Sequence, residues 1–461
     1  MSKVHILVFP YPAQGHILAL LDLTHHLALG GLTITIIITP KNLPILNPLL
    51  STHPNTIQTL ILPFPSHPNI PAGAENLREV GNTGNYPFIN ALSKLQQPII
   101  QWFTTHPNPP VALISDFFLG WTHQLATQLS IPRIAFHGVG ALLTAVLNRC
   151  FRNPTTFQSK EVADFPGIPG TPSFRRDHLP TVFLRYRESE PESELVRESL
   201  VANAASWGSI FNTFRALEGP VLDHVRAESG CQRVFAVGPL GSDRVDANPD
   251  GGSGVLRWLD QWVEDEGSVL YVCFGSQKLM RKEQMEALAF GLERSGCRFI
   301  WVVKEAFTAE EGYGKVPEGF ENRVAGRGIV VKGWVPQVAI LGHRVVGGFL
   351  SHCGWNSVME AMVAGTVIVG WPMEADQFVN ARLLVEELGV AVRACEGADS
   401  VPDPDELGRV ISRVMGVDSP QKERAELMRG EAVKAMSEGG SSSKELDQLV
   451  EALLQLGVKE E

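Results

Sequence analysis

The chain has 461 residues, more than a single hydrophobic core ordinarily holds, so its length predicts two domains. Hydrophobic residues make up 44% of the chain and charged residues 19%, which is the composition of a globular protein. The formal net charge of −11 argues against a nucleic-acid or anionic-membrane partner, because either would require a basic face.

The six cysteines lie far apart, and no two form a Cys-x-x-Cys pair. In a chain of this length, that spacing predicts free thiols in a reducing compartment. Pro10 and Pro12 interrupt the first apolar run, so it does not read as a signal peptide. No apolar run approaches the roughly 20 residues that span a bilayer. We therefore expect a cytoplasmic monomer without stable membrane insertion.

Short apolar runs alternate with amphipathic stretches along the whole chain, an order that predicts parallel sheets covered by helices. In the first half, the runs expected to form buried strands are residues 5–9, 33–39, 111–115, 133–137 and 209–213. Residues 17–29 carry apolar side chains at the spacing of one helix face. Residues 157–199 are charged, contain proline and lack a clear period. We expect them to form either an irregular excursion over a cleft or a solvated insertion.

A polar stretch rich in glycine, residues 241–255, is the expected linker. Beyond it, the expected strands are residues 268–274, 298–303, 328–332, 346–350 and 367–370. The expected helices are residues 282–293, 338–343, 357–364 and 377–388. The sequence thus predicts a first domain at residues 1–240, a second at 256–435, and a final helix at 436–461 that packs back on the first domain. A ligand should bind at the carboxyl ends of strands in the cleft between the domains.

The chain lacks the patterns of dinucleotide, ATP and metal sites. Residues 138–140 (Gly-Val-Gly) follow a predicted strand, but Leu143 stands where a dinucleotide fingerprint has its third glycine. No Walker phosphate loop is present. Asp403 and Asp405 directly precede a predicted helix, where capping explains them better than metal binding. We therefore expect neither a metal nor a bound cofactor.

A predicted strand-turn-helix transition at residues 351–357, Ser-His-Cys-Gly-Trp-Asn-Ser, has the features of an anion site. The backbone N–H groups at a helix start and the positive end of the helix dipole both attract a phosphate. His352, Asn356 and Ser357 can add side-chain donors. Taken alone, Asn356 and Ser357 are equally well explained as helix caps.

The wider segment, residues 334–377, resembles the signature box of the plant family 1 UDP-glycosyltransferases. The positions that carry the resemblance are Trp334, Pro336, Gln337, His343, Gly348, the run from His352 to Ser357, Glu360, Gly365, Trp371, Pro372, Asp376 and Gln377. Further matches lie at residues 12–16, Asp116, and residues 212–214, 238–240 and 274–276. Thr366-Val367 departs from the family, which usually has Val-Pro there. Residues 61–68 resemble the branch of the family that acts on flavonoids and phenols.

This resemblance implies the α/β GT-B fold, two facing Rossmann-like βα domains with a cleft between them. It implies an inverting transfer of sugar from a UDP-sugar without a metal, with UDP-glucose as the donor because of Gln377. Trp334 would stack on uracil beside the Val335 backbone, and Glu360 with Gln337 would bind the ribose. The residues implied at the diphosphate are Ser276, His352, Gly354, Asn356 and Ser357. Those implied at the sugar are Trp355, Asp376 and Gln377.

The resemblance also implies that His16 is the general base that takes the proton of the acceptor hydroxyl. Imidazole titrates near the working pH, and a place at a helix start favours its neutral form. Asp116 would bond the other ring nitrogen and stabilise the imidazolium. The alternatives are that His16 is a turn or capping residue and Asp116 a strand-end turn residue. Phe117 and Phe118 offer an apolar wall for a small hydrophobic acceptor such as a flavonoid or simple phenol.

Three classes of function stay open at this point. The leading one is a glycosyltransferase, with UDP-rhamnose or UDP-xylose as alternatives to UDP-glucose. A UDP-sugar epimerase shares a two-domain architecture but needs neither an acceptor pocket nor the His16–Asp116 pair. A non-catalytic UDP-sugar-binding protein would hold the nucleotide without turnover, and the presence of both residues argues against it.

Overall fold

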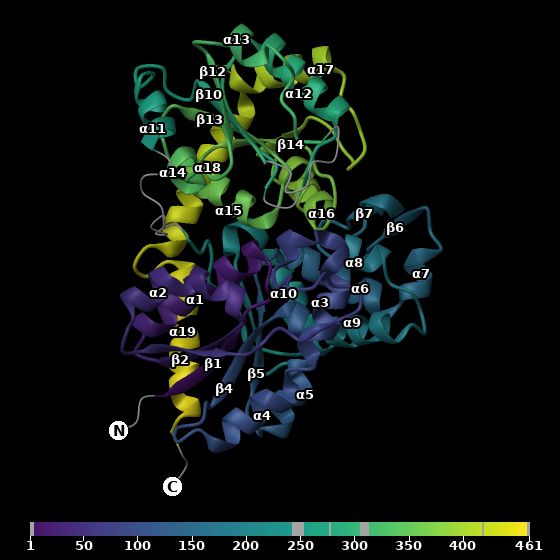
Figure 1. Cartoon of the computed structure of the whole chain (residues 1–461), viewed down its shortest axis with the longest axis vertical. Helices are drawn as coiled ribbons and strands as arrows, with labels where there is room; N and C mark the ends of the chain where they lie inside the picture. The colour runs from purple at the N-terminus through teal and green to yellow at the C-terminus, as the bar shows by residue number, and fades with distance from the viewer. Residues whose placement is uncertain (1–3, 242–252, 276–277, 305–312, 417–418, 459–461) are drawn as a thin grey trace. The chain divides into compact units, whose positions relative to one another are not determined.

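The computed structural model describes residues 4–241, 253–275, 278–304, 313–416 and 419–458. The chain forms two compact units (Figure 1). The first unit comprises residues 1–241 and 434–461, and the second comprises residues 242–433. Most of the predicted linker lies outside the described residues. Each unit contains a sheet of parallel strands, as the alternation of the sequence predicted.

The sheet of the first unit has seven strands in the order β3-β2-β1-β4-β5-β8-β9. The strands are β1 (His5–Phe9), β2 (Thr33–Ile38), β3 (Ile57–Ile61), β4 (Ala112–Asp116), β5 (Arg133–His137), β8 (Gly208–Phe211) and β9 (Val234–Ala236). All five strands predicted in this half are present, with ends within two residues of the prediction. Strand β3 was not predicted because it lies at the sheet edge, where Gln58 and Thr59 break its apolar run.

The helices of this unit are α1 (Gln14–Leu29), α2 (Asn47–Thr52), α3 (Asn85–Ser93), α4 (Gln96–Thr105), α5 (Thr122–Gln128), α6 (Ala141–Arg152), α7 (Pro154–Gln158), α8 (Thr181–Leu184), α9 (Pro191–Ala202), α10 (Arg215–Ser229) and α19 (Ser441–Leu456). Short 3₁₀ turns include η4 (Phe117–Leu119) and η6 (Asn203–Ala205). Helix α1 begins at Gln14, three residues before the predicted start. Its first turn, Gln-Gly-His, carries no apolar side chain, so apolar spacing could not locate it.

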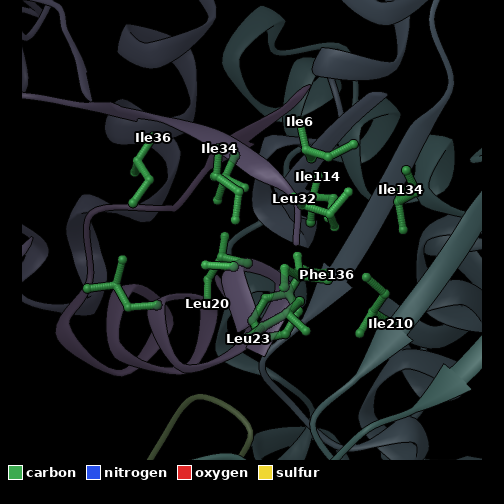
Figure 2. Close-up of a cluster of buried hydrophobic side chains, with 14 of the residues drawn as sticks. Ile6, Leu20, Leu23, Leu32, Ile34, Ile36, Ile114, Ile134, Phe136 and Ile210 are labelled. Carbon is green, nitrogen blue, oxygen red and sulfur yellow. The ribbon is translucent and has the colours of Figure 1, made fainter. Parts of the chain in front are cut away.

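Aliphatic side chains between the sheet and α1 form the core of the first unit (Figure 2). The strands contribute Ile6, Ile34, Ile114, Ile134 and Ile210, and α1 contributes Leu20 and Leu23. Every residue of β1, β4 and β5 is buried. Parallel strands covered on both faces read as continuous apolar runs, which is why the sequence located them well.

Residues 157–199 are more ordered than either prediction for them. They contain the end of α7, an antiparallel hairpin of β6 (Val162–Asp164) and β7 (Ser173–Arg175), the short helix α8 and most of α9. Phe157, Phe165 and Phe183 are 8%, 2% and 0% exposed, so the prediction of a solvated insertion is wrong. These apolar residues are spaced irregularly among charged ones, so they give no period to detect in the sequence.

Helix α19 packs on the sheet of the first unit, although about 200 residues separate it from β9 in the sequence. Leu449 and Leu453 are fully buried in the core that α1 also lines. The Ser442 hydroxyl donates to the carbonyl of Gly238 at 2.6 Å. A Cβ atom at Gly30 would lie 2.8 Å from the Val450 side chain, so glycine permits the close approach of α19 to the end of α1.

The second unit has a six-stranded parallel sheet in the order β12-β11-β10-β13-β14-β15. Its strands are β10 (Val269–Cys273), β11 (Arg298–Val303), β12 (Gly328–Lys332), β13 (Val346–Ser351), β14 (Val367–Gly370) and β15 (Ala391–Arg393). Its helices are α11 (Ser253–Asp260), α12 (Lys282–Ser295), α13 (Phe320–Arg323), α14 (Gln337–Leu341), α15 (Trp355–Ala364), α16 (Gln377–Arg382), α17 (Pro404–Met415) and most of α18 (Pro420–Met436). The predicted helix 377–388 divides at Arg382, where a π-helical turn, Leu383–Glu387, follows α16.

The structure also decides the prediction for Asp403. The Asp403 carboxylate caps α17 by accepting the N–H of Glu406 at 2.9 Å, as the capping explanation predicted. Among the described residues, no helix combines the length and the apolar character needed to cross a membrane.

Candidate active site

Two neighbouring strands of the first unit bring His16 and Asp116 together. Strands β1 and β4 run parallel side by side, so their carboxyl ends lie at the same edge of the sheet. Asp116 is the last residue of β4, and His16 is the third residue of α1, which follows β1. The Nδ1 atom of His16 lies 2.8 Å from Oδ2 of Asp116.

The bond to Asp116 assigns the protonation of the His16 ring. A carboxylate accepts, so Nδ1 carries the hydrogen, and Nε2 is the nitrogen that can take up a proton. Asp116 is fully buried, and its Oδ1 atom accepts the backbone N–H of Phe118 at 2.9 Å. Asp116 thus caps the turn η4, as the alternative for it predicted, and also orients a histidine ring.

Aromatic rings hold the imidazole of His16 on several sides. Phe117 and Phe118 stack on it with ring centroids at 5.6 and 5.2 Å. Tyr11 meets it edge-on at 5.3 Å and donates to the Asn85 side chain at 2.8 Å. Phe117 and Phe118 are 3% and 8% exposed, so most of their surface lies against protein. Their contact with an acceptor stays a prediction. In the structure, both rings stack on the His16 imidazole and restrict its orientation.

A buried arginine lies on the strand next to Asp116. Arg133 begins β5, which pairs with β4, and is 2% exposed. One of its N–H groups reaches the main-chain carbonyl of Asp116 at 3.3 Å. Arg133 was not predicted from the sequence as a neighbour of the His16–Asp116 pair. The available signal was a charged residue inside a run that otherwise reads as a buried strand, because such a charge requires partners in the fold.

In the second unit, the turn between β13 and α15 is built by local strain and side-chain bonds. Cys353 has a φ of 65°, an unusual value for a non-glycine residue. Its N–H donates to the Ser351 hydroxyl at 3.1 Å, and its carbonyl accepts from the Asn380 side chain at 2.9 Å. Helix α15 starts directly afterwards, with Gly354 at the N-cap position. Asn356 and Ser357 therefore lie inside the first turn, and neither occupies the cap.

Three residues predicted to bind the nucleotide are bonded to one another. The Gln337 amide donates to Oε2 of Glu360 at 2.6 Å and to the Ser357 hydroxyl at 3.2 Å. The amide oxygen of Gln337 accepts from the buried hydroxyl of Tyr271 at 3.1 Å. Tyr271, which the sequence analysis did not single out, therefore fixes the orientation of the Gln337 amide.

His352 sits against glycine backbone on two sides. A Cβ atom at Gly275 or Gly354 would lie 2.7 or 2.6 Å from its Nε2 atom, so both positions require glycine for this approach. Burial lowers the pKa of His352 to about 4, so the ring is neutral at physiological pH. Its Nδ1 atom has no hydrogen-bond partner among the described residues. A neutral ring can offer an N–H donor to an anion without a competing salt bridge.

The residues predicted to meet the sugar lie around the start of α16. The Gln377 side-chain oxygen accepts the N–H groups of Met373 and Glu374 at 2.9 and 3.1 Å, which fixes the direction of its amide. Asp376 accepts from the Asn380 side chain at 2.6 Å. Asn380 therefore connects this turn to the Cys353 turn.

The remaining predicted residues differ in exposure. Trp334, in the loop after β12, is 47% exposed, while Val335 beside it is buried. An exposed tryptophan offers a large apolar face for stacking. The Trp355 side chain is 3% exposed, and Ser276 lies outside the described residues.

Among the residues that the structure describes, no three His, Cys, Asp or Glu side chains gather as metal ligands would.

The chain was compared with known families, proteins and structures. A family model described as UDP-glucoronosyl and UDP-glucosyl transferase matches residues 257–403. UDP-glycosyltransferase 89A2 of Arabidopsis thaliana is 50% identical over 446 residues, covering 96% of this chain and 94% of that protein. The flavonol 3-O-glucosyltransferase UGT89B1 of the same species is 47% identical over 468 residues, covering 99% and 98%.

The same relationship holds for solved structures. The crystal structure of UGT89C1 from Arabidopsis thaliana matches with a TM-score of 0.82 at 36% identity, covering 98% of this chain and 100% of that one. UGT89C1 has been crystallised with quercetin, with UDP and with UDP-L-rhamnose. The coverage includes both units and therefore the whole fold. The chain belongs to the UDP-glycosyltransferase family, has the GT-B fold, and is an enzyme of that family.

Proposed function

We propose that this enzyme transfers glucose from UDP-glucose to a hydroxyl of a flavonol or a related phenol and inverts the anomeric carbon. The observation that carries the proposal is the 2.8 Å contact between His16 Nδ1 and the buried Asp116 carboxylate. This geometry is that of a general base with its orienting partner. A passive binding protein has no use for such a pair, and an epimerase has no acceptor hydroxyl to deprotonate.

In this reaction, the acceptor hydroxyl loses its proton to His16 Nε2 as its oxygen attacks the anomeric carbon. The bond from that carbon to the phosphate oxygen breaks, and its electron pair leaves with UDP. Asp116 stabilises the imidazolium that forms, because its carboxylate accepts the hydrogen on Nδ1. The stacked rings of Phe117 and Phe118 limit the motion of His16 during this transfer.

The second unit supplies the UDP-sugar site in this proposal. Trp334 stacks on uracil beside the Val335 backbone, and the bonded pair of Gln337 and Glu360 receives the ribose hydroxyls. The residues proposed at the diphosphate are Ser276, His352, Gly354, Asn356 and Ser357. Their N–H and O–H donors stabilise the negative charge that grows on departing UDP, so the reaction needs no metal.

The choice of donor sugar depends on the turn that contains Trp355, Asp376 and Gln377. The oxygen of the Gln377 amide is held by backbone N–H groups, so the amide presents its N–H donors to a sugar hydroxyl. Support for glucose comes from Gln377 itself and from the relative UGT89B1, which is named a glucosyltransferase. The second candidate is rhamnose, because UGT89C1 has been crystallised with UDP-L-rhamnose.

The test is turnover of quercetin by wild type, His16→Ala and His26→Ala, with UDP-glucose and UDP-rhamnose supplied separately. His26 lies on the same helix and is the matched control. We expect His16→Ala to lower kcat by about 10²- to 10⁴-fold, while UDP affinity and the His26→Ala rate stay close to wild type. NMR should show a β-glucoside formed from the α-linked donor.

Three results would contradict parts of the proposal. A His16→Ala enzyme that retains wild-type turnover would show that His16 is not the base. Faster transfer from UDP-rhamnose than from UDP-glucose would show that UDP-rhamnose is the preferred donor. Binding of UDP-glucose without glycosylation of any flavonol or phenol would show that these compounds are not the acceptors.

A further inference from the structure

The hydrogen bonds of the Asp116 carboxylate bring no positive charge to compensate for its burial. It is fully buried, and its oxygens accept from His16 Nδ1 and from the Phe118 backbone. Before proton transfer, His16 as general base is neutral, so neither of these donors carries a compensating charge. A carboxylate removed from water without a nearby positive charge tends to take up a proton and become neutral. Protonated Asp116 would stabilise an imidazolium poorly.

Arg133 is buried on the adjacent strand with its N–H groups satisfied by uncharged oxygens. Its partners are Ser115 Oγ at 3.0 Å, Thr122 Oγ1 at 3.1 Å, Asn203 Oδ1 at 2.8 Å, Ser206 Oγ at 2.8 Å and the main-chain carbonyl of Asp116 at 3.3 Å. None of these acceptors is a carboxylate oxygen. The rigid fork of a guanidinium suits such a set of fixed acceptors.

The two buried charges act on each other without touching. Burial lowers the pKa of Arg133 to about 9, and the Asp116 carboxylate opposes this by raising it. The guanidinium reaches Asp116 through the main-chain carbonyl rather than through the side chain. A direct salt bridge would compete for the carboxylate oxygens that His16 and Phe118 use.

From this geometry we infer that Arg133 is a positioning residue for sugar transfer. Its guanidinium keeps Asp116 ionised by supplying positive charge from behind β4, and it leaves the carboxylate oxygens to His16 and the Phe118 N–H. The inference rests on the proposed function, because Arg133 acts only through the His16–Asp116 pair. Loss of its charge would make both Asp116 and His16 hold their protons more tightly. The acid limb of the activity profile would then move to higher pH.

Three other titratable groups interact electrostatically with Arg133 or Asp116. Burial, followed by the charge of Arg133, lowers the pKa values of His123 on α5 and His137 at the end of β5. Burial, followed by Asp116, raises the pKa of Tyr11. Two carboxylates of this unit are bonded to other groups: Glu218 accepts the first N–H groups of α6, and Glu194 on α9 accepts from the Tyr186 hydroxyl. Arg133 is therefore the positive charge that faces Asp116 from the neighbouring strand.

The experiment compares wild type with Arg133→Gln, Arg133→Lys and Ser206→Ala. Glutamine keeps N–H donors but removes the charge, lysine keeps the charge but loses the fork, and Ser206→Ala removes one acceptor of the guanidinium. The measured quantity is the pH midpoint of the acid limb of kcat/KM for quercetin. Circular dichroism and UDP affinity verify the fold of each variant.

We expect Arg133→Gln to raise this midpoint by about one pH unit. Arg133→Lys and Ser206→Ala should lower the rate or the stability but leave the midpoint within about 0.3 of wild type, since the charge remains. A folded Arg133→Gln enzyme with an unmoved midpoint would overturn the inference. So would a Ser206→Ala midpoint that moves as far as that of Arg133→Gln, because the effect would then be structural.

A double variant addresses the case in which Arg133→Gln does not fold. Asp116→Asn leaves the guanidinium buried without its opposing charge, and Arg133→Gln does the reverse. Removing both charges should give a higher unfolding temperature than the two single losses predict. If the unfolding temperature of the double variant falls by as much as the losses of the two single variants added together, the inference is contradicted. Failure of the proposed function is recognised separately, because wild type itself would then form no glycoside.

Discussion

Histidine serves two different purposes in the first unit, and exposure separates them. The side chain of His16 is 21% exposed and bonds the Asp116 carboxylate, as the proposed general base requires. His137 is 2% exposed and lies between two rings, with centroid distances of 4.3 Å to Phe211 and 5.7 Å to Phe117. The Phe117 ring thus stacks on both the partly exposed His16 and the buried His137.

His137 should make the protein sensitive to mild acid. Burial, with a further contribution from Arg133, lowers its pKa to about 3, below the unfolded value near 6.5. Below about pH 6.5, the unfolded chain takes up a proton that the folded chain refuses, so stability falls as pH falls. His137→Phe retains the aromatic stack. Between pH 6.5 and pH 5.5, its free energy of unfolding should fall by about 1 kcal/mol less than that of wild type. Urea unfolding at the two pH values measures this difference, and equal losses would show that His137 is protonated when folded.

Among the elements, the turn η4 directly follows Asp116 and packs against α9. Gly120 follows η4, and a Cβ atom there would lie 1.7 Å from the Ser199 carbonyl oxygen. Helix α9 therefore contacts this turn through backbone, which requires glycine at position 120. The same turn is held by Asp116, so the order of residues 157–199 contributes to the site.

Gly120→Ala should force α9 away from η4. Overpacking of this kind costs about 1–3 kcal/mol of unfolding free energy, and the displaced turn should also lower kcat. Gly219→Ala in α10 is the matched control, because a Cβ atom there meets nothing within 4 Å. The control should change the unfolding free energy by less than about 1 kcal/mol. Thermal unfolding of both variants measures this difference. Equal losses of unfolding free energy would contradict the contact between Gly120 and α9.

At the scale of the whole molecule, the first unit is assembled from both ends of the chain. Residues 434–461 belong to it, and α19 covers part of its sheet. The chain therefore passes through the second unit before the first is complete. Folding of the unit that carries His16 should require the last helix.

Leu453 and Leu454 offer a direct test of this dependence, because they are neighbours on α19. Leu453 is fully buried in the core, whereas Leu454 is 37% exposed. Leu453→Ala should lower the free energy of unfolding by about 2–5 kcal/mol through the cavity it leaves. Leu454→Ala should cost less than about 1 kcal/mol. Urea unfolding measures both, and equal effects would show that α19 does not pack into this core.

The family and most of the parallel strands could be predicted from the sequence. Strands such as β5 and β14 match their predicted bounds, because strands buried on both faces leave uninterrupted apolar runs. The turn between β13 and α15 was recognisable because its residues follow one another closely in the chain. The start of α1 and the edge strand β3 were missed, since neither shows an apolar pattern of its own.

Several contacts between distant side chains could be identified only in the folded chain. The contact between His16 and Asp116, which are 100 residues apart, was implied by the family resemblance, but no pattern in the sequence connects Arg133 with Asn203, 70 residues away. The ordered folding of residues 157–199 and the docking of α19 likewise depend on surfaces contributed by remote segments. The physical reason is the range of each signal: periodicity reports what a segment buries, while packing alone selects the partner against which it is buried.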